Sequence, residues 1–472
     1  MRQSSVVNVS SIIDDQPIRR ITVRVFAICF LAMLSEGYDL GVTGYAAPGI
    51  LKGFGIVRDQ MAPIFSAALF GMLIGALLAG VIGDRFGRKG GIIGASIVVC
   101  AGSFASANAP TLHALLLARF VVGLGLGGIL PNVTALMAEF LPKRIRGAFT
   151  AYAFMGITAG GILPSLTTGF LREEDWRSLF VIGGIIPLCC LPLLLLFLPE
   201  SLKFLALHKK HTSKLRHWLH QIAPDTPLVD DARFVIDERK LEGSFLETIF
   251  AQRLRFITPT LWICFISIMM VNFFVNSWLT VLLRDIGYTH SQSALTSSLY
   301  YIGGVTGGLV IGFALDRIGS IVLAVATACG GIASVLLGAF HGSHQIVDLL
   351  VFVVGFAVLG SQVGMSSLAG MLYQTAVRSK GAGLAHSVGR LGAISGPLIA
   401  GVLMADHVSL LGLFSVPAVP MACAAIGFLA ITWIWTGRAG GRGFVALHAI
   451  QNERDAADEQ LRSPASSLIN QA

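Results

Sequence analysis

Charged residues are scarce in this sequence, and the residue patterns of most enzymes are missing. Lys, Arg, Asp and Glu together make up 13% of the 472 residues, against roughly 25% in soluble domains. No zinc-ligand spacing, nucleophile elbow or phosphate-binding Gly-Lys-Ser/Thr loop occurs. The first 20 residues lack an apolar core with a cleavage site, so we expect no removable signal peptide. These absences argue against a soluble protein, an enzyme or an ATP-driven pump, and we expect neither a metal site nor an organic cofactor.

Apolar stretches near 20 residues long recur instead from end to end. Apolar residues make up 54% of the chain, and a helix of about 20 residues crosses roughly 30 Å of hydrocarbon. Lipid offers no partners for backbone polar groups, so each stretch must be helical. We therefore predict an all-α polytopic membrane protein with twelve spans at about 22–47, 61–82, 91–109, 112–140, 148–170, 177–198, 256–283, 292–315, 320–341, 346–376, 381–405 and 408–436.

The net charge of +8 follows membrane topology and does not indicate nucleic-acid binding. An even number of spans puts both ends of the chain on one side, and 27 of the 34 Lys and Arg lie on that side. The positive-inside rule makes this side cytoplasmic, so we expect both termini in the cytoplasm. Five residues lie on the other side, Lys52, Arg58, Arg172, Arg177 and Arg284, and two lie within spans, Arg119 and Arg390.

The two halves of the chain resemble each other. Six residues match at a constant offset of 232: Gly71, Gly75, Gly80, Asp84, Arg85 and Gly87 with Gly303, Gly307, Gly312, Asp316, Arg317 and Gly319. A duplicated six-span unit follows. We expect an N-terminal segment over 1–21, a six-helix bundle over 22–198, a cytoplasmic central loop over 199–255, a second bundle over 256–436 and a cytoplasmic tail over 437–472. Paired halves in transporters hold the substrate near the midplane between them.

The loop after the second span carries a specific motif. It reads Gly80-Val81-Ile82-Gly83-Asp84-Arg85-Phe86-Gly87-Arg88-Lys89, which resembles the G-x-x-x-D-R-x-G-R-[RK] signature of the major facilitator superfamily. Asp84 can accept hydrogen bonds from a facing helix N-terminus or from an arginine, so the loop can act as a conformational latch. We assign to this latch Gly80, Asp84, Arg85, Gly87 and Arg88, the repeat copies Asp316 and Arg317, and Glu139, with Arg88 or Arg146 as its partner.

Further stretches narrow the resemblance. The stretch from Arg119 in the fourth span to Arg146 just after it is similar to the superfamily's second signature, and Pro199-Glu200-Ser201 follows the sixth span as it does in the superfamily. The stretches Glu36-Gly37-Tyr38-Asp39, 360–364 and 389–397 resemble the aromatic acid:proton symporter family, bacterial carriers of benzoate-type acids, where the first stretch is usually D-G-x-D. The resemblance implies a monomer in the bacterial inner membrane whose partners are the lipid bilayer, a proton and a small aromatic acid.

Two carboxylates in the first span are candidates for proton coupling. Glu36 lies 12 residues past Arg24, roughly 18 Å along a helix and so near mid-membrane. Glu36 and Asp39 are three residues apart and share a helix face. Two close carboxylates in a low dielectric cannot easily both ionise, so the pair can take up a proton outside and release it inside. A structural pair satisfied by neighbouring helices is the alternative.

Two arginines within spans are candidates for binding the anion. Arg390 lies near the midplane of the eleventh span, and a guanidinium matches a carboxylate with two hydrogen bonds. Arg390 can bind the substrate, pair permanently with Glu36 or Asp39, or do each in turn, so that the substrate and the protein's acids compete for one arginine. Arg119, in the outer half of the fourth span, can attract the anion or pair with the same acids.

Polar and aromatic side chains near the midplane complete the predicted site. His386 lies one turn before Arg390 on the same face, where it can titrate or pack through a hydrogen bond. An aromatic ring needs an apolar slot with a few polar anchors. The candidates are Tyr38, Phe273, Phe274, Trp278 and Tyr301 for the ring, and Asn132, Asn272, Asn276, Gln362 and Ser366 for its polar groups.

These residues favour a proton-coupled importer of an aromatic carboxylate that works by alternating access. Benzoates, hydroxybenzoates, protocatechuate, vanillate and phenylpropionates all present one carboxylate and one ring, and the sequence does not choose among them. Import of another organic acid or metabolite, or proton-coupled efflux by antiport, is the alternative. A receptor is disfavoured because there is no sizeable domain outside the spans and because an internal repeat suits alternating access.

Overall fold

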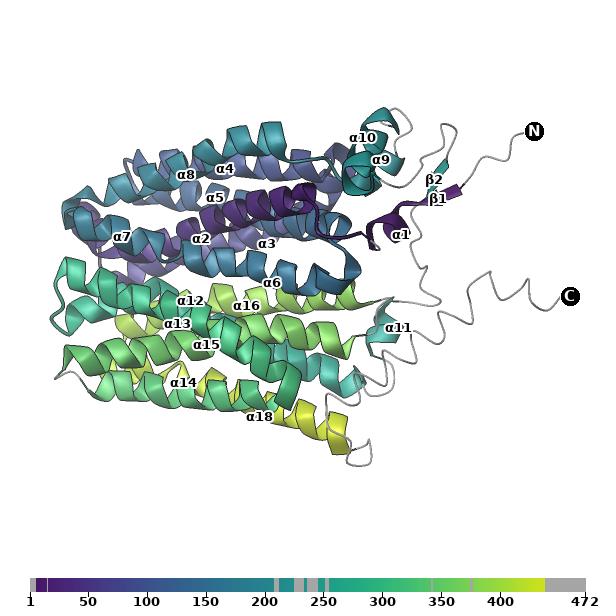
Figure 1. Cartoon of the computed structure of the whole chain (residues 1–472). Coiled ribbons are helices and arrows are strands. Elements are labelled where there is room, and N and C mark those ends of the chain that lie inside the picture. Colours follow the sequence, from purple (N-terminus) through teal and green to yellow (C-terminus); the bar gives the residue numbers. More distant parts are fainter. Residues whose placement is uncertain are drawn as a thin grey trace, which may run out of the picture.

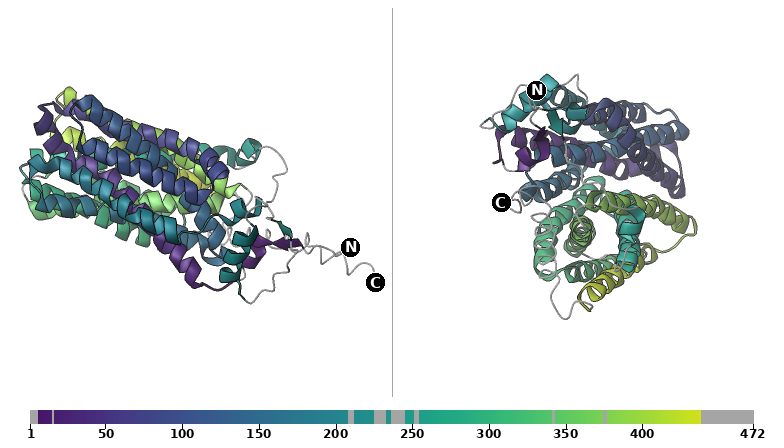
Figure 2. Two further views of the ribbon diagram at one scale, coloured as in Figure 1. Left: turned by 90° about the horizontal axis from the view of Figure 1, so that it is seen from above. Right: turned by 90° about the vertical axis from the view of Figure 1, so that its right-hand side faces the viewer.

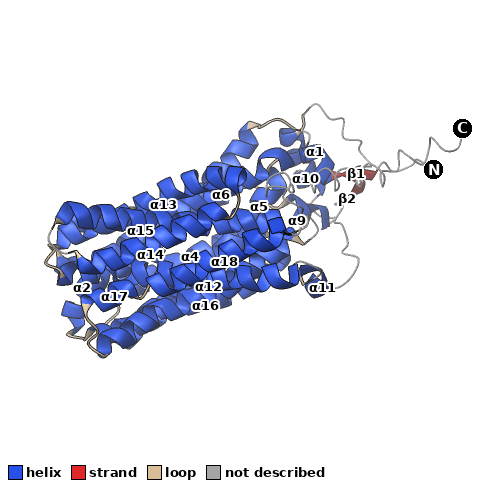
Figure 3. Cartoon of the chain, turned by 90° about the horizontal axis from the view of Figure 1, so that it is seen from below, coloured by secondary structure: helices blue, strands red, loops and turns tan. Residues whose placement is uncertain are grey.

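The computed structural model describes residues 6–14, 16–207, 212–224, 233–235, 245–250, 254–340, 343–373 and 377–437. Nearly all of these residues are helical (Figure 3). Within these ranges, twelve helical segments are long and apolar enough to cross a membrane. The predicted all-α fold with twelve spans is therefore confirmed.

The long helices form two groups, one from each half of the chain, which lie against each other along their length (Figures 1 and 2). The first group contains α2 (Arg20–Phe54), α3 (Ala62–Phe86), α4 (Arg88–Ala107), α5 (Leu112–Phe140), α6 (Lys143–Gly160), α7 (Leu163–Phe170) and α8 (Trp176–Phe197), with 3-10 turns η1 (Arg58–Met61) and η2 (Glu173–Asp175). The second contains α12 (Leu254–Asp285), α13 (His290–Ile318), α14 (Ile321–Ala339), α15 (His344–Leu372), α16 (Arg378–Ala405), α17 (Leu410–Ser415) and α18 (Ala418–Gly437).

Two spans are broken where proline prevents a continuous helix. The span predicted over 148–170 consists of α6 and α7, and Pro164 lies in the first turn of α7. A proline donates no backbone hydrogen bond, and its ring clashes with the carbonyl group four residues earlier. The last span consists of α17 and α18 in the same way, with Pro417 directly before α18.

The same helix pairs pack together in both halves. α2 packs on α6, α3 on α5 and α4 on α8, and in the second half α12 packs on α16, α13 on α15 and α14 on α18. Repeated glycines explain one of these contacts, because a Cβ on Gly75 would collide with the backbone of α5 and a Cβ on Gly307 with that of α15. Gly87 and Gly319 end α3 and α13 with φ values of 86° and 72°, which glycine adopts without steric cost.

Short elements gather at one end of the bundle, which we call the α1 end (Figure 1). They are β1 (Val6–Asn8), α1 (Val9–Asp14), α9 (Leu202–Leu207), α10 (Thr212–Ile222), β2 (Arg233–Val235) and α11 (Phe245–Ile249). The described part of the central segment packs on the bundle, since Leu205 of α9 and Leu219 of α10 are buried and Gln221 accepts a hydrogen bond of 3.1 Å from Arg24 of α2. Beyond Gly437 the predicted tail lies outside the described residues.

Ion pairs join the two halves at the opposite end of the bundle. Arg58 of η1 donates hydrogen bonds of 2.5 and 2.6 Å to the carboxylate of Asp285 at the end of α12. The adjacent Arg284 donates to Glu173 of η2 at 2.9 Å, and the Lys52 ammonium lies 3.9 Å from the same carboxylate. Neighbouring residues of α12 thus carry opposite charges, and each is paired with the first half.

Candidate functional site

A cavity of about 140 Å³ lies between the two halves, near the middle of the long helices. Its volume is roughly ten times what one water molecule needs, so it can hold a molecule with a single aromatic ring. The wall from the first half is largely apolar and includes Leu40, Leu69, Met72, Leu130, Phe154 and Ile157. The second half supplies most of the polar groups: Asn272, Asn276, Tyr301, Gln362, Ser366, His386 and Arg390.

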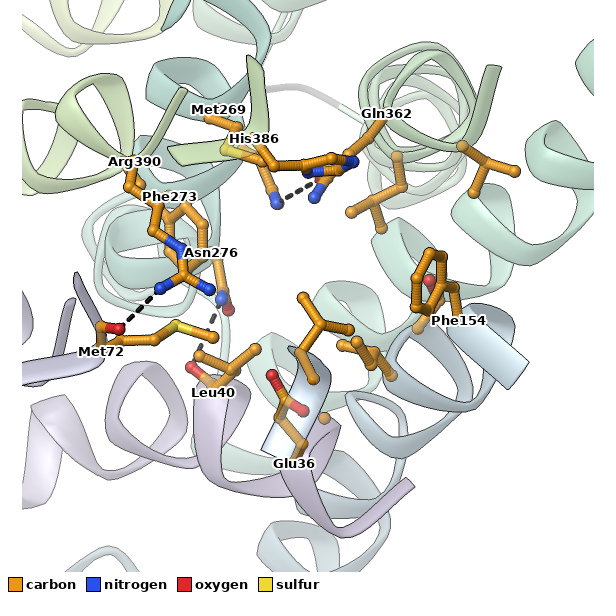
Figure 4. A pocket seen from close by; sticks show the side chains of 18 of the residues that line it. Glu36, Leu40, Met72, Phe154, Met269, Phe273, Asn276, Gln362, His386 and Arg390 are labelled. Carbon is orange, nitrogen blue, oxygen red and sulfur yellow. Dashed lines mark hydrogen bonds between the residues drawn. The ribbon is translucent and has the colours of Figure 1, made fainter. Parts of the chain in front are cut away.

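Arg390 of α16 points into this cavity (Figure 4). Its Nη1 atom donates a hydrogen bond of 2.6 Å to the backbone carbonyl of Met72 in α3, which belongs to the other half. A guanidinium has five N–H donors. Among the described residues this is the one hydrogen bond of Arg390, so most of its donors remain available to an anion.

Glu36 of α2 borders the cavity from the first half (Figure 4). Its side chain is fully buried, and neither carboxyl oxygen has a hydrogen-bond partner among the described residues. No ion pair within 4.0 Å joins Glu36 to Arg390, although both border the same cavity. A buried charge needs a partner, and the described side chains provide Glu36 with none in this conformation.

Asp39 lies next to Glu36 along α2 but turns into the first half, where it meets Arg119 of α5. Arg119 Nη1 lies 3.9 Å from Asp39 Oδ1, and the same oxygen accepts a hydrogen bond of 2.9 Å from Ser103. Arg119 also donates from Nε to Ser106 at 3.0 Å and stacks 4.6 Å from the centre of the Phe180 ring. Of the roles predicted for Arg119, the structure shows pairing with an acid of the first span, and Arg119 does not line the cavity.

Replacing Asp39 by alanine should destabilise the protein strongly. Arg119 is completely buried, and removing one partner of a buried pair leaves an uncompensated charge at a cost of about 3–5 kcal/mol. The thermal unfolding midpoint of the purified protein should fall, and a second change, Arg119→Met, should restore most of the loss because it removes the stranded charge. A midpoint unchanged by Asp39→Ala would contradict this interpretation.

Two chains of hydrogen bonds run through the amide side chains of α12. In one chain, Tyr300 of α13 donates to Asn272 Oδ1 at 3.0 Å, and Asn272 Nδ2 donates to Gln362 Oε1 of α15 at 2.8 Å. In the other, Tyr301 donates to Asn276 Oδ1 at 2.6 Å, and Asn276 Nδ2 donates 3.3 Å to a backbone carbonyl in α2. The structure therefore brings together the predicted residues Asn272, Asn276, Gln362 and Tyr301 and adds Tyr300, which the sequence did not single out.

His386 borders the cavity one turn before Arg390. Its Nε2 atom lies 3.0 Å from Ser366 Oγ, and Ser366 can also donate to the backbone carbonyl of Gln362 at 3.1 Å. Either the hydroxyl or the imidazole can donate in the contact between His386 and Ser366, according to the tautomer of the ring. The ring also packs edge-on against Phe265, 4.8 Å between centroids. Of the two roles predicted for His386, the structure shows hydrogen-bonded packing.

Besides Arg119, four of the residues predicted to bind the substrate lie outside the cavity. Tyr38 donates a hydrogen bond of 2.9 Å to a backbone carbonyl in α8, within the first half. Trp278 donates 3.2 Å to a backbone carbonyl in α16 and packs on Phe65, and Phe274 is buried in the same apolar core. Asn132 is buried beside the Asp84 loop and donates to a carbonyl of its own helix at 2.8 Å. The three aromatic side chains are held by packing and hydrogen bonds, whereas Phe273 and Tyr301, the other two predicted aromatics, do line the cavity.

The latch residues lie at the α1 end. Asp84 is exposed and accepts a hydrogen bond of 2.6 Å from Arg88. The backbone amide of Lys89 donates to the Glu200 carboxylate at 3.0 Å, and a Cβ on Gly87 would collide with that carboxylate. The motif loop is therefore held against the end of α8, within the first half.

Glu139 has partners other than the predicted arginines. Its carboxylate accepts hydrogen bonds of 2.6 Å from Ser201 and 3.1 Å from the backbone amide of Lys203. Arg146 instead donates to Asp14 of α1 at 2.9 Å. The reason is that the chain after α8 folds back over Glu139 and supplies donors closer than either arginine.

Two of the remaining latch residues contact an aromatic ring of their own helix. The guanidinium groups of Arg85 and Arg317 lie 5.5 and 4.2 Å from the ring centres of Phe86 and Phe313, and Gly80 faces open space. The side chain of Asp316 lies outside the part of the chain that the structure describes. A latch role for these residues stays a prediction.

Known proteins resemble this chain over most of its length. The family model of the Major Facilitator Superfamily matches residues 29–343 and 261–467. The 4-hydroxybenzoate transporter PcaK of Pseudomonas putida is 34% identical, with 90% of this chain and 95% of the relative covered. The gallate transporter of Pseudomonas putida is 33% identical over the same shares.

A solved structure shares the fold. The xylose transporter XylE from E. coli, in a partially occluded inward open conformation, matches with a TM-score of 0.68 at 17% identity, over 86% of this chain and 96% of that one. The resemblance to aromatic acid carriers that the motifs predicted is confirmed by the relatives. The chain belongs to the major facilitator superfamily and is a transport protein, not an enzyme.

Proposed function

We propose that this protein imports an aromatic carboxylate together with protons across a bacterial inner membrane by alternating access. The printed functions of its relatives, transport of 4-hydroxybenzoate and of gallate, support an aromatic acid as the substrate. The observation that carries the proposal is the guanidinium of Arg390 in a cavity between the two halves. A fixed positive charge in such a place is costly unless an anion or an acid of the protein uses it.

The cavity suits a molecule with a carboxylate at one side and a ring beside it. Arg390 can bind the carboxylate through the donors that make no hydrogen bond to the described residues. Phe273, Met72 and Leu40 border the same space and can enclose an aromatic ring. A pocket with apolar walls and a few placed polar groups is the usual form of a small-molecule site.

Glu36 and Asp39 are proposed to have different parts in proton coupling. Glu36 borders the cavity with no partner of its own among the described residues, so it can exchange a proton with the cavity and interact with Arg390 when the substrate is absent. Asp39 is engaged with Arg119 inside the first half. Protonation of Asp39 would release Arg119 and loosen that half, so Asp39 can link protonation to the change of conformation.

The ion pairs at the end opposite α1 are proposed to close the outer gate. If the α1 end is cytoplasmic, as the distribution of Lys and Arg predicts, then Arg58–Asp285 and Arg284–Glu173 hold the outer ends of the halves together. The halves would then rock about the central cavity, and these pairs must break for the substrate to enter from outside.

Reversing one charge of this gate should favour the outward-open state. Asp285→Arg places two positive charges together, and an exposed pair contributes about 0.2–1 kcal/mol, so the population ratio should change by up to roughly fivefold. Distances between spin labels in η1 and in the turn after α12 would measure the populations of the two states. The swap Arg58→Asp with Asp285→Arg should restore the original distribution, and equal distances in all three proteins would argue against a gate.

Uptake by reconstituted vesicles tests the proposal directly. An inward proton gradient should drive accumulation of labelled 4-hydroxybenzoate. An antiporter would expel the compound instead, and a carrier specific for another substrate would not transport it. One proton with one monoanion carries no net charge, whereas a second proton would couple voltage at roughly 2.3 kcal/mol per 100 mV. Accumulation under voltage alone would therefore support two protons per substrate, and its absence would exclude them.

A further inference from the structure

One of the two hydrogen-bond chains of α12 ends at the cavity with an unused donor. Tyr300 donates to Asn272, and Asn272 donates to Gln362. Tyr300 is 1% exposed and lies behind the cavity wall, whereas Asn272 and Gln362 border the cavity. Gln362 therefore connects a buried phenol to the space that the substrate would occupy. Figure 4 shows Gln362 at the wall of that space.

The buried phenol sets the direction of the whole chain. A tyrosine hydroxyl has one hydrogen to donate, and Asn272 is the one acceptor that the described residues offer Tyr300. If Asn272 turned its NH₂ group toward Tyr300, the phenol hydrogen would be buried without a partner, which is costly. Asn272 must therefore present its carbonyl to Tyr300 and its NH₂ group to Gln362.

The same reasoning determines what Gln362 presents to the cavity. Its carbonyl oxygen accepts from Asn272 at 2.8 Å, which turns that oxygen toward Asn272 and leaves the NH₂ group as the donor that a ligand can use. An amide NH₂ group donates hydrogen bonds and accepts none. Between described residues, no hydrogen bond of this NH₂ group is found.

The neighbouring chain ends differently. Tyr301 donates to Asn276, and Asn276 donates to the backbone carbonyl of Leu40 in the other half. Both ends of that chain are satisfied by the protein itself. The contrast singles out Gln362 as the amide whose donor is kept for something outside the protein.

We propose that Gln362 selects, among aromatic acids held by Arg390, those whose ring carries a hydrogen-bond acceptor. Tyr300 and Asn272 are positioning residues that keep the Gln362 NH₂ group turned toward the substrate. The proposal rests on the proposed function, because it needs the substrate in this cavity. A methoxy, carbonyl or hydroxyl oxygen can accept from Gln362, whereas an amino group on the ring is chiefly a donor and would face another donor.

A matched set of benzoates tests the selection. Binding of 3- and 4-methoxy-, methyl- and aminobenzoate to the full chain in lipid nanodiscs would be measured by titration calorimetry. The methyl compounds match the aminobenzoates in size but offer no polar atom. At the better ring position, methoxybenzoate should bind about tenfold more tightly than aminobenzoate, because the mismatch leaves a desolvated donor unpaired. Equal affinities for all three substituents would overturn the proposal.

Variants of the chain separate positioning from general damage. Gln362→Leu should reduce the methoxy-to-amino ratio to within about twofold. Tyr300→Phe removes the constraint on the two amides, so they can turn and present a carbonyl, and aminobenzoate should then bind more tightly than it does to the unmodified protein. A gain of affinity cannot come from poor folding. Tyr373→Phe, which removes another buried hydroxyl of the second half outside the cavity, should leave the ratio unchanged.

The outcomes also distinguish this proposal from the proposed function. If Arg390→Ala abolishes binding of every benzoate but Gln362→Leu and Tyr300→Phe leave the ratio unchanged, the selection by Gln362 is wrong and the transport site stands. If Arg390→Ala leaves all affinities unchanged, the substrate binds elsewhere and the proposed function itself fails.

Discussion

Replacing Arg390 by alanine is expected to abolish transport of aromatic carboxylates and to weaken their binding on the order of 30- to 5,000-fold. Truncating one partner of a buried, hydrogen-bonded charge pair costs about 2–5 kcal/mol, and each 1.4 kcal/mol is tenfold in affinity. The loss should be large because the carboxylate would then enter an apolar space without a compensating charge. Titration calorimetry and vesicle uptake measure the two effects.

Two further variants make this result specific. Arg390→Lys keeps the charge but cannot form two parallel hydrogen bonds, so its affinity should lie between those of alanine and arginine. Arg255→Ala removes an exposed arginine of the same half and should bind substrate normally. Normal uptake by a folded Arg390→Ala protein would show that the carboxylate is recognised at another place.

Replacing Glu36 by glutamine is expected to uncouple transport from the proton gradient. Glutamine has nearly the same shape but cannot bind or release a proton, and the buried carboxyl it replaces has no partner among the described residues. Arg390 would still bind the anion, so exchange of labelled for unlabelled substrate should continue. Under an inward proton gradient, the accumulation ratio should fall to about one, as measured by uptake into vesicles.

The comparison with other acids makes this prediction sharper. Glu174→Gln changes an exposed acid and should accumulate substrate like the unmodified protein, and Glu36→Asp should retain coupling because it retains a carboxyl group. If Glu36→Gln still accumulates substrate as steeply as the unmodified protein, the coupling proton is carried elsewhere, and Asp39 becomes the first residue to test.

The sequence predicts which charged residues face the interior of the protein, because charges within a span cannot face lipid. Glu36 and Arg390 lie deep within apolar spans, and both border the cavity between the halves. The repeated glycines likewise indicated that corresponding helices approach closely in the two halves, as α3 with α5 and α13 with α15 do. Both inferences follow from constraints that act on every membrane helix and do not depend on how a helix is rotated.

The rotation of each helix could not be predicted, and this explains the residues that fell outside the cavity. Each of the predicted aromatic and amide residues outside it lies two positions from a residue that lines it: Tyr38 from Glu36, Asn132 from Leu130, Phe274 from Asn272 and Trp278 from Asn276. Two residues turn a helix through about 200°, so such pairs point in nearly opposite directions. Positions four apart stay on one face, as Glu36 with Leu40 and Asn272 with Asn276 do. Knowing one lining residue in each helix would have removed these errors.

Among the described residues, Arg390 and Asn276 donate hydrogen bonds from the second half to main-chain oxygens of the first, those of Met72 and Leu40. No substitution at either position deletes the acceptor, since every amino acid keeps its carbonyl group. The side chains of the apolar wall can therefore change in size and shape over evolution and fit substrates with other rings. The hydrogen bond from Arg390 to the opposite bundle would persist through such changes. Mutational tolerance and a conserved mode of closure would then coexist on one surface.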